Sequence, residues 1–259
     1  MTLRATTVAR PPRLAAVALL LLLAGCATTP SVAPQRSALA HWTPSPNFNV
    51  RKAQLIVLHH TSIGDPAAAL QVLRTRNSEG PVSAHYLVEA DGRIDQLVDD
   101  NARAWHAGSS RWAGVTDINS SSIGIEIDND GNSPFTQPQI QALVNLLADL
   151  TSRLGIPREA VVGHGDIAPG RKNDPSVQFP WATLASYGFG LWPDAVLIPA
   201  PPNFDSLAAM RLVGYDVSNP RNAIIAFHRH YRAMENETLD ATDAAILYSL
   251  QRKLMAPHP

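Results

Sequence analysis

The sequence predicts an α/β (α+β) fold, in which a mixed central β-sheet is flanked by helices and followed by a small C-terminal three-helix domain. Short apolar runs typical of buried strands, such as QLIVLHH at 54–60, are interleaved with segments of helical periodicity, of which 136–155 is the clearest. Such interleaving is typical of a sheet covered by helices. A proline-dense stretch, LWPDAVLIPAPP at 191–202, then precedes three shorter helical patterns.

The first elements follow from strand, cap and turn signals. Segment 54–60 is apolar and rich in β-branched residues, as buried strands are. Segment 66–77 is predicted to be a helix, with Asp65 as its N-cap and a proline at its first position. The run 84–98 is predicted to form two strands around Asp91-Gly92, a dipeptide that favours a tight hairpin.

A further strand and a long helix follow. SIGIEID at 122–128 alternates strictly, so its isoleucines should face one side of the sheet and Glu126 and Asp128 the other. In the next segment, apolar residues recur at helical spacing, and Thr136 and Gln139 are predicted to form a capping box at its start.

The C-terminal part is predicted to be a separate unit. We expect a linker at 192–202 and a helical domain at 203–259. Asn219 should cap one helix, and either Asp240 or Thr242 the last one. Three short helices bury little apolar surface alone, so this unit would gain stability by docking onto the preceding domain.

The composition is that of an ordinary globular protein with a proper core. Hydrophobic residues make up 45% of the 259 residues, and the formal net charge is −1. No basic patch interleaved with aromatic residues is present. Nucleic acid is therefore not expected as a partner.

The N-terminus has the pattern of a targeting segment. Basic residues precede an unbroken apolar stretch at 14–24, which is shorter than the roughly 20 residues that span a bilayer. The stretch ends in Leu-Ala-Gly-Cys, which resembles the lipobox of bacterial lipoprotein signal peptides and implies cleavage before Cys26 and lipidation of its thiol. The alternatives are a short buried helix and, for this single cysteine, an inert or catalytic thiol.

The lipobox divides the chain further. Residues 1–25 would be the signal peptide, and 26–47, rich in Pro, Ser, Thr and Ala, a flexible tether. Ala27 rather than an aspartate follows the cysteine. We therefore expect an outer-membrane lipoprotein that faces the periplasm and is anchored to the membrane through its lipid.

Polar side chains stand where the predicted strands end. His59 and His60 close the first strand, His164 follows a later apolar pair, and Asp174 lies in the same run, GHGDIAPGRKNDP. Two imidazoles and a carboxylate suit catalytic zinc, which keeps three protein ligands and one open position. The spacing alone leaves open ordinary strand-end residues, because the ligands would come from separated segments.

Five segments together resemble the type 2 N-acetylmuramoyl-L-alanine amidases, which share their fold with peptidoglycan recognition proteins. They are VLHHTS (57–62), SAHYLVEADGRI (83–94), AWHAG (104–108), SIGIEI (122–127) and GHGDIAPGRKNDP (163–175). The signal peptide and the C-terminal helices are similar to the lipoprotein branch of the family rather than to its cytoplasmic branch. The resemblance implies that 48–191 is a zinc amidase domain. It would hydrolyse the amide bond between N-acetylmuramic acid and L-alanine in peptidoglycan or muropeptides, for cell-wall turnover or recycling.

The resemblance also implies roles for single residues. It makes Zn²⁺ the cofactor, held by His59, His164 and Asp174. Alternation along a strand supports only one ligand from His59 and His60, because adjacent side chains point to opposite faces. Glu126 matches the catalytic acid that moves the proton of the activated water. Lys172 matches a lysine that stabilises the oxyanion of the transition state.

Further positions match the substrate-binding region of the family. His106 is expected to line the substrate groove, with a structural loop histidine as the alternative. His85 matches a position near the metal, and Arg171 would contact a substrate carboxylate or nothing. Asp166 would orient the nearby histidine ligand or cap a turn. The family usually has glycine where this chain has Ser176, a difference that could alter the turn but leaves the preceding ligand in place.

The C-terminal helices resemble a three-helix peptidoglycan-binding module in LVGYDV (212–217), in the stretch at 225–228 and in TDAAILYSL (242–250). The alternative is a helical cap that only stabilises the catalytic domain. For the whole chain, the alternative to hydrolysis is a non-catalytic recognition or tethering lipoprotein that binds peptidoglycan. The presence of all three candidate ligands together with Glu126 and Lys172 favours the enzyme.

Overall fold

The computed structural model describes residues 36–256, apart from 48, 51 and 78–79. The predicted signal peptide at 1–25 and the predicted lipidation site Cys26 lie outside the described residues. Within the described part of the chain, no helix combines the length and the apolar character needed to cross a membrane.

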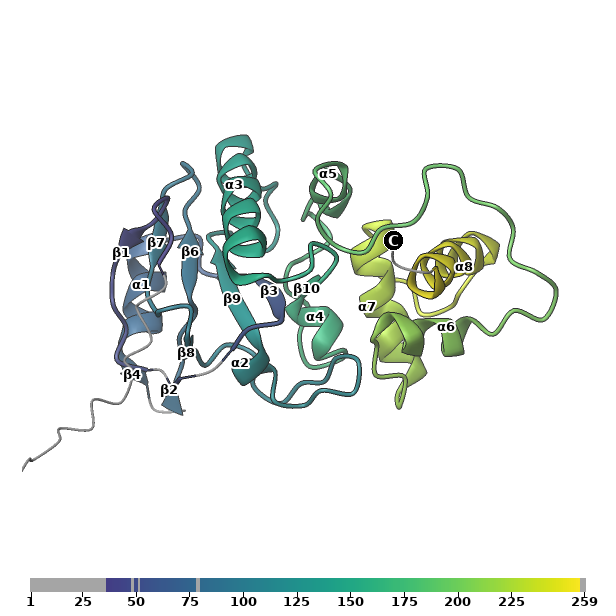
Figure 1. Ribbon diagram of the computed structural model, residues 1–259, viewed down its shortest axis with the longest axis horizontal. Coiled ribbons are helices and arrows are strands. Elements are labelled where there is room, and N and C mark those ends of the chain that lie inside the picture. The colour runs from purple at the N-terminus through teal and green to yellow at the C-terminus, as the bar shows by residue number, and fades with distance from the viewer. Residues whose placement is uncertain (1–35, 48, 51, 78–79, 257–259) are drawn as a thin grey trace, which may run out of the picture. The chain divides into compact units, whose positions relative to one another are not determined.

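A six-stranded mixed sheet forms the centre of the body, as predicted (Figure 1). Its strands in spatial order are β1 (His41–Trp42), β7 (Ile94–Gln96), β6 (Tyr86–Val88), β9 (Ser122–Ile127), β3 (Leu55–His60) and β10 (Val161–Gly163). Neighbouring strands are parallel except for β6 and β7, which form the predicted hairpin around Gly92. Two short antiparallel pairs, β2 (Asn49–Val50) with β8 (Ala102–Arg103) and β4 (Arg76–Asn77) with β5 (Gly80–Pro81), lie outside this sheet.

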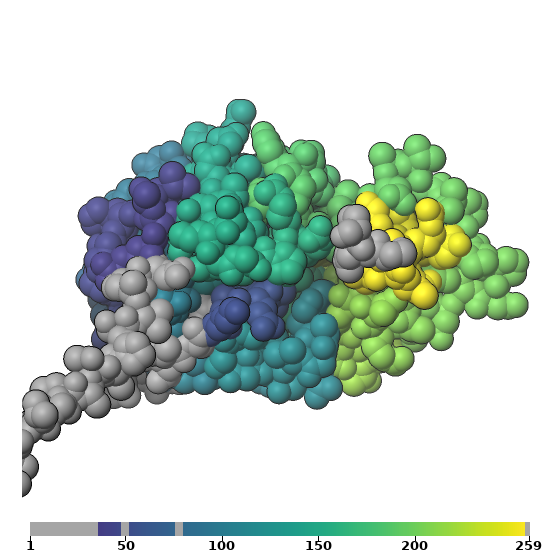
Figure 2. All heavy atoms as spheres, viewed as in Figure 1, coloured from purple at the N-terminus to yellow at the C-terminus, as the bar shows by residue number. Residues whose placement is uncertain are grey.

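Helix α3 (Gln137–Leu154) covers one face of the sheet (Figure 1). In the space-filling view its atoms form a continuous surface over the middle of the body (Figure 2). Ile56 and Leu58 of β3 belong to the main hydrophobic core together with side chains of α3. Leu55 and Val57 belong to a second, smaller cluster. Because β3 is buried on both faces, its first four residues, 55–58, are an unbroken apolar run.

Side-chain caps explain where the helices of the body begin. Asp65 caps α1 (Pro66–Arg74) and Thr136 caps α3, as predicted. Gln139, however, does not complete the expected capping box. Its side-chain amide donates instead to the carbonyl oxygens of Val88 and Asp128, at 3.1 and 2.9 Å. These bonds tie the start of α3 to β6 and to the end of β9.

Residues 36–47, predicted as the end of a flexible tether, are part of the folded body. β1 pairs with β7, and the backbone N–H groups of Thr43 and Ser45 donate to the carbonyls of Gln96 and Leu97. Ser37 and Ser45 are buried. The Pro- and Ser-rich composition conceals this strand, because backbone hydrogen bonds rather than apolar side chains hold it at the edge of the sheet.

The C-terminal helices form a hydrophobic cluster of their own around Met210, Phe227 and Leu247. They are α6 (Ser206–Val213), α7 (Pro220–Arg232) and α8 (Ala241–Met255). Asn219 caps α7, and Asp240 rather than Thr242 caps α8. Helix α7 packs against α4 (His164–Ile167) and α5 (Trp181–Ser186), so this three-helix unit touches the segment that follows β10.

Candidate metal centre and active site

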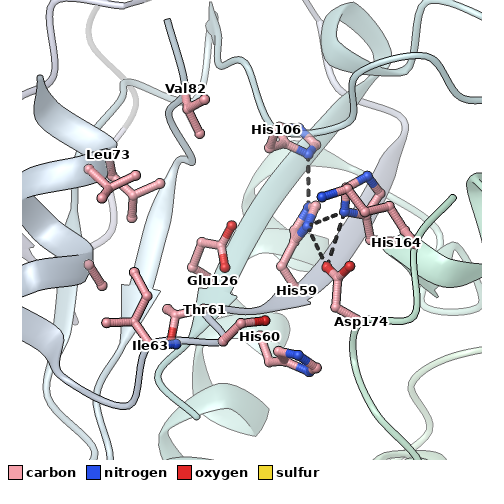
Figure 3. A pocket seen from close by; sticks show the side chains of 14 residues that line it. His59, His60, Thr61, Ile63, Leu73, Val82, His106, Glu126, His164 and Asp174 are labelled. Carbon is pink, nitrogen blue, oxygen red and sulfur yellow. Dashed lines mark hydrogen bonds and ion pairs between the residues drawn. The ribbon is translucent and has the colours of Figure 1, made fainter. Parts of the chain in front are cut away.

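A cavity of about 320 Å³ opens at the carboxyl ends of β3 and β9. One wall is polar and contains His59, His106, Glu126, His164, Lys172 and Asp174. The other wall is apolar and contains Ile63, Val72, Leu73 and Val82. Figure 3 shows Glu126 between the two walls. In open α/β sheets the carboxyl ends of the strands are the usual place for a ligand.

Three groups of the polar wall lie close enough to share one metal ion. Nδ1 of His59 is 2.9 Å from Nδ1 of His164, and each of these nitrogens is 3.1 Å from Oδ2 of Asp174 (Figure 3). All three side chains are buried. Two imidazole nitrogens and a carboxylate oxygen suit zinc and other divalent transition metals. No second cluster of this kind occurs among the described residues.

The parallel strands bring the three groups together. β10 lies beside β3, with Gly163 opposite Leu58. His164, the first residue after β10, therefore lies next to His59 at the same edge of the sheet. Asp174 comes from the loop that follows α4 and completes the cluster.

The alternation of β3 separates the two adjacent histidines. His59 lies on the side of Val57, whereas His60 lies on the side that faces α3. His60 accepts a hydrogen bond at Nδ1 from the backbone N–H of Ser176, at 3.1 Å. Ser176 has no positive φ, so serine replaces the glycine of the family without backbone strain. The structure thus brings His59 into the cluster and leaves His60 outside it.

A chain of hydrogen bonds runs outward from His59. Its Nε2 is 3.0 Å from Nδ1 of His106, and Nε2 of His106 is 3.2 Å from Oγ of Ser122. The Ser122 hydroxyl donates to the carbonyl of Ile118 in α2 (Ile118–Ser121), at 2.6 Å. The serine oxygen then accepts from His106, and His106 accepts from His59. This direction leaves Nδ1 of His59 with a free lone pair for a metal ion.

His164 is oriented by the backbone of the AWHAG segment. Its Nε2 donates to the carbonyl of Ala107, at 3.1 Å, which leaves Nδ1 as the ligand atom. Arg171 supports the same loop, because its Nη2 donates to the Ala107 carbonyl at 2.6 Å and its Nε to the Ser109 carbonyl at 2.9 Å. The Arg171 guanidinium, expected to contact a substrate carboxylate or nothing, is therefore bound to backbone oxygens.

His85 and Gly124 support the site without lining the cavity. His85 is buried and does not line the cavity. It accepts a hydrogen bond from the N–H of Gly124, at 2.9 Å, and its Nε2 donates to the carbonyl of Ala102, at 3.0 Å. A Cβ atom on residue 124 would lie 2.4 Å from Cγ of His106. Only glycine at this position leaves room for the imidazole that contacts His59.

Burial and charge set the protonation of the central groups. Burial, reinforced by the charge of Asp174 and opposed by that of Lys172, raises the pKa of Glu126 to about 8. Burial and the neighbouring His164 lower the pKa of His59 to about 4, so its ring is neutral near pH 7. Burial opposes ionisation of Asp174, but its contacts with the imidazole rings of His164 and His59 outweigh burial and hold its pKa well below the usual range.

The sequence patterns singled out neither Ser122 nor the Ala107 carbonyl. For Ser122, the signal was its place in the alternating strand, because it shares a face of β9 with Gly124 and Glu126. The Ala107 carbonyl could not be found from a side-chain pattern, because every residue has a backbone carbonyl group.

Comparison with known proteins agrees with this site. Residues 49–177 match the family model described as N-acetylmuramoyl-L-alanine amidase. The chain is 36% identical to the Escherichia coli N-acetylmuramoyl-L-alanine amidase AmiD over 271 residues, covering 92% of this chain and 96% of AmiD. It is 45% identical over 108 residues to 1,6-anhydro-N-acetylmuramyl-L-alanine amidase AmpD of Haemophilus influenzae, covering 40% of this chain and 58% of that protein.

Two solved structures are similar to this chain over most of its length. The complex of E. coli AmiD with anhydro-N-acetylmuramic acid-L-Ala-D-gamma-Glu-L-Lys matches with a TM-score of 0.69 and 36% identity, over 85% of this chain and 93% of AmiD. AmpDh3 from Pseudomonas aeruginosa matches with a TM-score of 0.71 and 34% identity, over 86% of this chain and 99% of that chain. With relatives matched over nearly their full length and a metal-binding cluster in place, this chain belongs to the N-acetylmuramoyl-L-alanine amidase family.

Proposed function

We propose that this chain is a zinc-dependent amidase that cleaves the bond between the lactyl carbonyl of N-acetylmuramic acid and the nitrogen of L-alanine. Its substrate is peptidoglycan or the muropeptides released from it, and its role is cell-wall turnover or recycling. The convergence of His59, His164 and Asp174 with Glu126 and Lys172 in one cavity carries the proposal. The substrate named in the AmiD complex supports a muropeptide ligand.

The donor set supports zinc. Two neutral imidazoles and one carboxylate are a common three-ligand set of catalytic zinc sites, which leave a further position open. Burial, which lowers the pKa of His59 to about 4, keeps that ring available as a ligand at neutral pH. A bound zinc ion would polarise the scissile carbonyl and lower the pKa of a water molecule.

Glu126 and Lys172 supply the remaining chemistry. The Glu126 carboxylate accepts the proton of the attacking water and passes it to the leaving nitrogen of L-alanine, so the C–N bond breaks after the new C–O bond has formed. Its raised pKa, about 8, lies near the operating pH of an acid-base group, and a nearby divalent cation lowers it by favouring the ionised form. The Lys172 ammonium stabilises the negative charge that develops on the carbonyl oxygen.

Non-catalytic recognition of peptidoglycan is the competing proposal. Binding alone gives no reason to place the partly buried carboxyl group of Glu126 beside a metal cluster, because withdrawing such a group from water is energetically costly. General acid-base catalysis gives that reason, since burial is how enzymes tune such a group. The raised pKa of the Glu126 carboxyl group in the cavity that holds the cluster therefore favours hydrolysis over recognition alone.

The decisive experiment incubates the purified chain with muropeptides, with and without a chelator, and identifies the products by mass spectrometry. We expect free peptides that begin with L-alanine, lost on chelation and restored by zinc. Glu126→Gln should bind zinc normally and lose about 10²-fold or more in turnover, whereas Asp128→Asn, a nearby carboxylate outside the cavity lining, should stay active. If the muropeptides stay intact although zinc is bound, the chain recognises peptidoglycan without hydrolysing it.

We further propose that the chain is an outer-membrane lipoprotein facing the periplasm, anchored through a lipid on Cys26. The support is the sequence at the N-terminus, since Cys26 lies outside the described residues. Cys26→Ser should move the protein from the membrane fraction to the soluble fraction of disrupted cells. An unchanged distribution would contradict lipid anchoring.

A further inference from the structure

One buried carboxylate joins the metal-binding turn to the C-terminal helices. Asp166 is 3% exposed and has three hydrogen-bond partners. Its Oδ2 accepts from the backbone N–H of Gly163 and from Nδ1 of His230, both at 2.7 Å. Its Oδ1 accepts from the hydroxyl of Tyr215, at 2.9 Å. Two of the three donors thus come from the three-helix unit.

The turn that Asp166 stabilises carries the ligand His164. Helix α4 has four residues, fewer than a helix needs to be stable alone. Its conformation therefore depends on contacts from outside. The bond from Gly163 to Asp166 closes this turn around His164, so the position of the Asp166 carboxylate sets the direction in which the ligand leaves β10.

The two donors from the helical unit are themselves held firmly. The His230 ring stacks on Trp181 of α5, with centroids 3.8 Å apart and planes at 13°. The Tyr215 ring meets Trp112 edge-on, with centroids 5.0 Å apart. Both donors are buried, as their exposures of 5% for His230 and 2% for Tyr215 indicate. The two donors from the helical unit therefore fix the position of the Asp166 carboxylate.

Helix α7 also lies directly against the turn. A Cβ atom on Gly165 would come within 2.8 Å of Nη1 of Arg229, a buried residue of α7 that pairs with Glu235. The glycine after His164 thus leaves room for the helical unit. The packing on both sides of His164 depends on residues far away in the sequence.

We propose that Tyr215 and His230 are positioning residues for the metal site: through Asp166 they hold His164 in its ligating orientation, so the three-helix unit is required for tight metal binding. This role is additional to any binding of peptidoglycan by the same helices. This positioning role rests on the proposed function in one respect: His164 is taken to be a ligand of the metal ion.

The test measures zinc affinity without substrate, by competition with a chromogenic chelator, on the full chain. Tyr215→Phe combined with His230→Phe removes both donors and keeps both aromatic contacts. Loss of partners behind a ligand typically weakens metal binding by 10–100-fold, and we expect that loss here. Asp166→Asn should give a loss of the same order. Tyr231→Phe is the matched control, because the Tyr231 hydroxyl donates to the Leu191 carbonyl instead.

Two further measurements separate positioning from general instability. His230→Asn places an amide near the site of Nδ1 and should recover part of the affinity that His230→Phe loses. With saturating zinc, kcat of the double variant should return towards the wild-type value at unchanged KM. A folded double variant that binds zinc as tightly as wild type would overturn the proposal. Wild-type protein that binds zinc but cleaves no muropeptide would contradict the proposed function and leave this inference intact.

Discussion

Replacing His106 by phenylalanine distinguishes a support for the metal site from a contact with substrate. In the structure Nδ1 of His106 accepts the hydrogen bond from Nε2 of His59, at 3.0 Å. His59 is 2% exposed, so water cannot replace the lost acceptor. Phenylalanine is close to histidine in size and leaves the N–H of His59 buried without a partner. The ring of His59 then loses the contact that fixes its orientation.

The expected loss can be worked from this one bond. A buried donor left without an acceptor costs about 1–3 kcal/mol. Without metal, the ring can carry its proton on Nδ1 and donate to Asp174, whereas a ring that ligates zinc must carry it on the unpaired Nε2, so this cost falls on zinc binding. Because about 1.4 kcal/mol corresponds to a factor of ten, zinc should bind about 5–150-fold more weakly. This range overlaps the 10–100-fold loss that is typical when a partner behind a metal ligand is removed. At saturating zinc, KM for a muropeptide should change little.

The assay is a competition titration with a zinc chelator, followed by kcat and KM with added zinc. His106→Asn retains an acceptor near the position of Nδ1 and should lose less affinity than His106→Phe. Ser122→Ala removes only the outer end of the chain of hydrogen bonds and should have the smallest effect. A His106→Phe protein with wild-type zinc affinity and a raised KM would refute this reasoning and make His106 a substrate contact.

Three further substitutions, at Gly124, Asp65 and Glu126, test the packing, the capping and the protonation of the body. Gly124→Ala should weaken zinc binding and lower Tm, because its Cβ would lie 2.4 Å from Cγ of His106 and overpacking costs about 1–3 kcal/mol; unchanged zinc affinity would contradict the close approach. Asp65→Ala should lower the free energy of unfolding by about 1 kcal/mol in urea denaturation without changing kcat, since this cap lies outside the cavity lining. In the metal-free protein, burial raises the pKa of Glu126 from 4.5 to about 8, so the folded state holds this proton more tightly than the unfolded state. The resulting stabilisation is complete below pH 4.5 and is lost as pH rises through about 8. Tm of metal-free wild type should therefore fall more than Tm of Glu126→Gln over that interval, and equal slopes would rule out the raised pKa.

The strands and helices of the body could be predicted because their signals are local. The apolar run of β3 and the strict alternation of β9 come from burial on both faces and from period-two geometry. The caps Asp65, Thr136 and Asn219 bond to backbone N–H groups within three residues. β1 could not be predicted in this way, because its partner, β7, lies about fifty positions away and contributes backbone groups that no composition reveals.

The same difference between local and distant signals divides the active site. His59, His164 and Asp174 stand in segments that resemble the amidase family, so the resemblance indicates them as ligands although their spacing alone does not. Their supports are distant: His106 reaches His59 across 47 positions, and Tyr215 reaches Asp166 across 49. No sequence pattern distinguishes such a donor from an ordinary buried tyrosine or histidine.

The family resemblance assigns different roles to three histidines, with His59 as a metal ligand, His106 in the substrate groove and His85 near the metal, and each has its own set of contacts in the structure. His59 turns a ring nitrogen to the metal cluster, His106 turns one to His59, and His85 binds backbone groups behind β9. The three rings follow one another outward from the cluster, with His106 next to His59 and His85 next to His106, and each stands on a different backbone segment. A substitution should therefore affect metal affinity less as more hydrogen bonds separate the substituted residue from the ligand nitrogens, with His85 the least sensitive of the three.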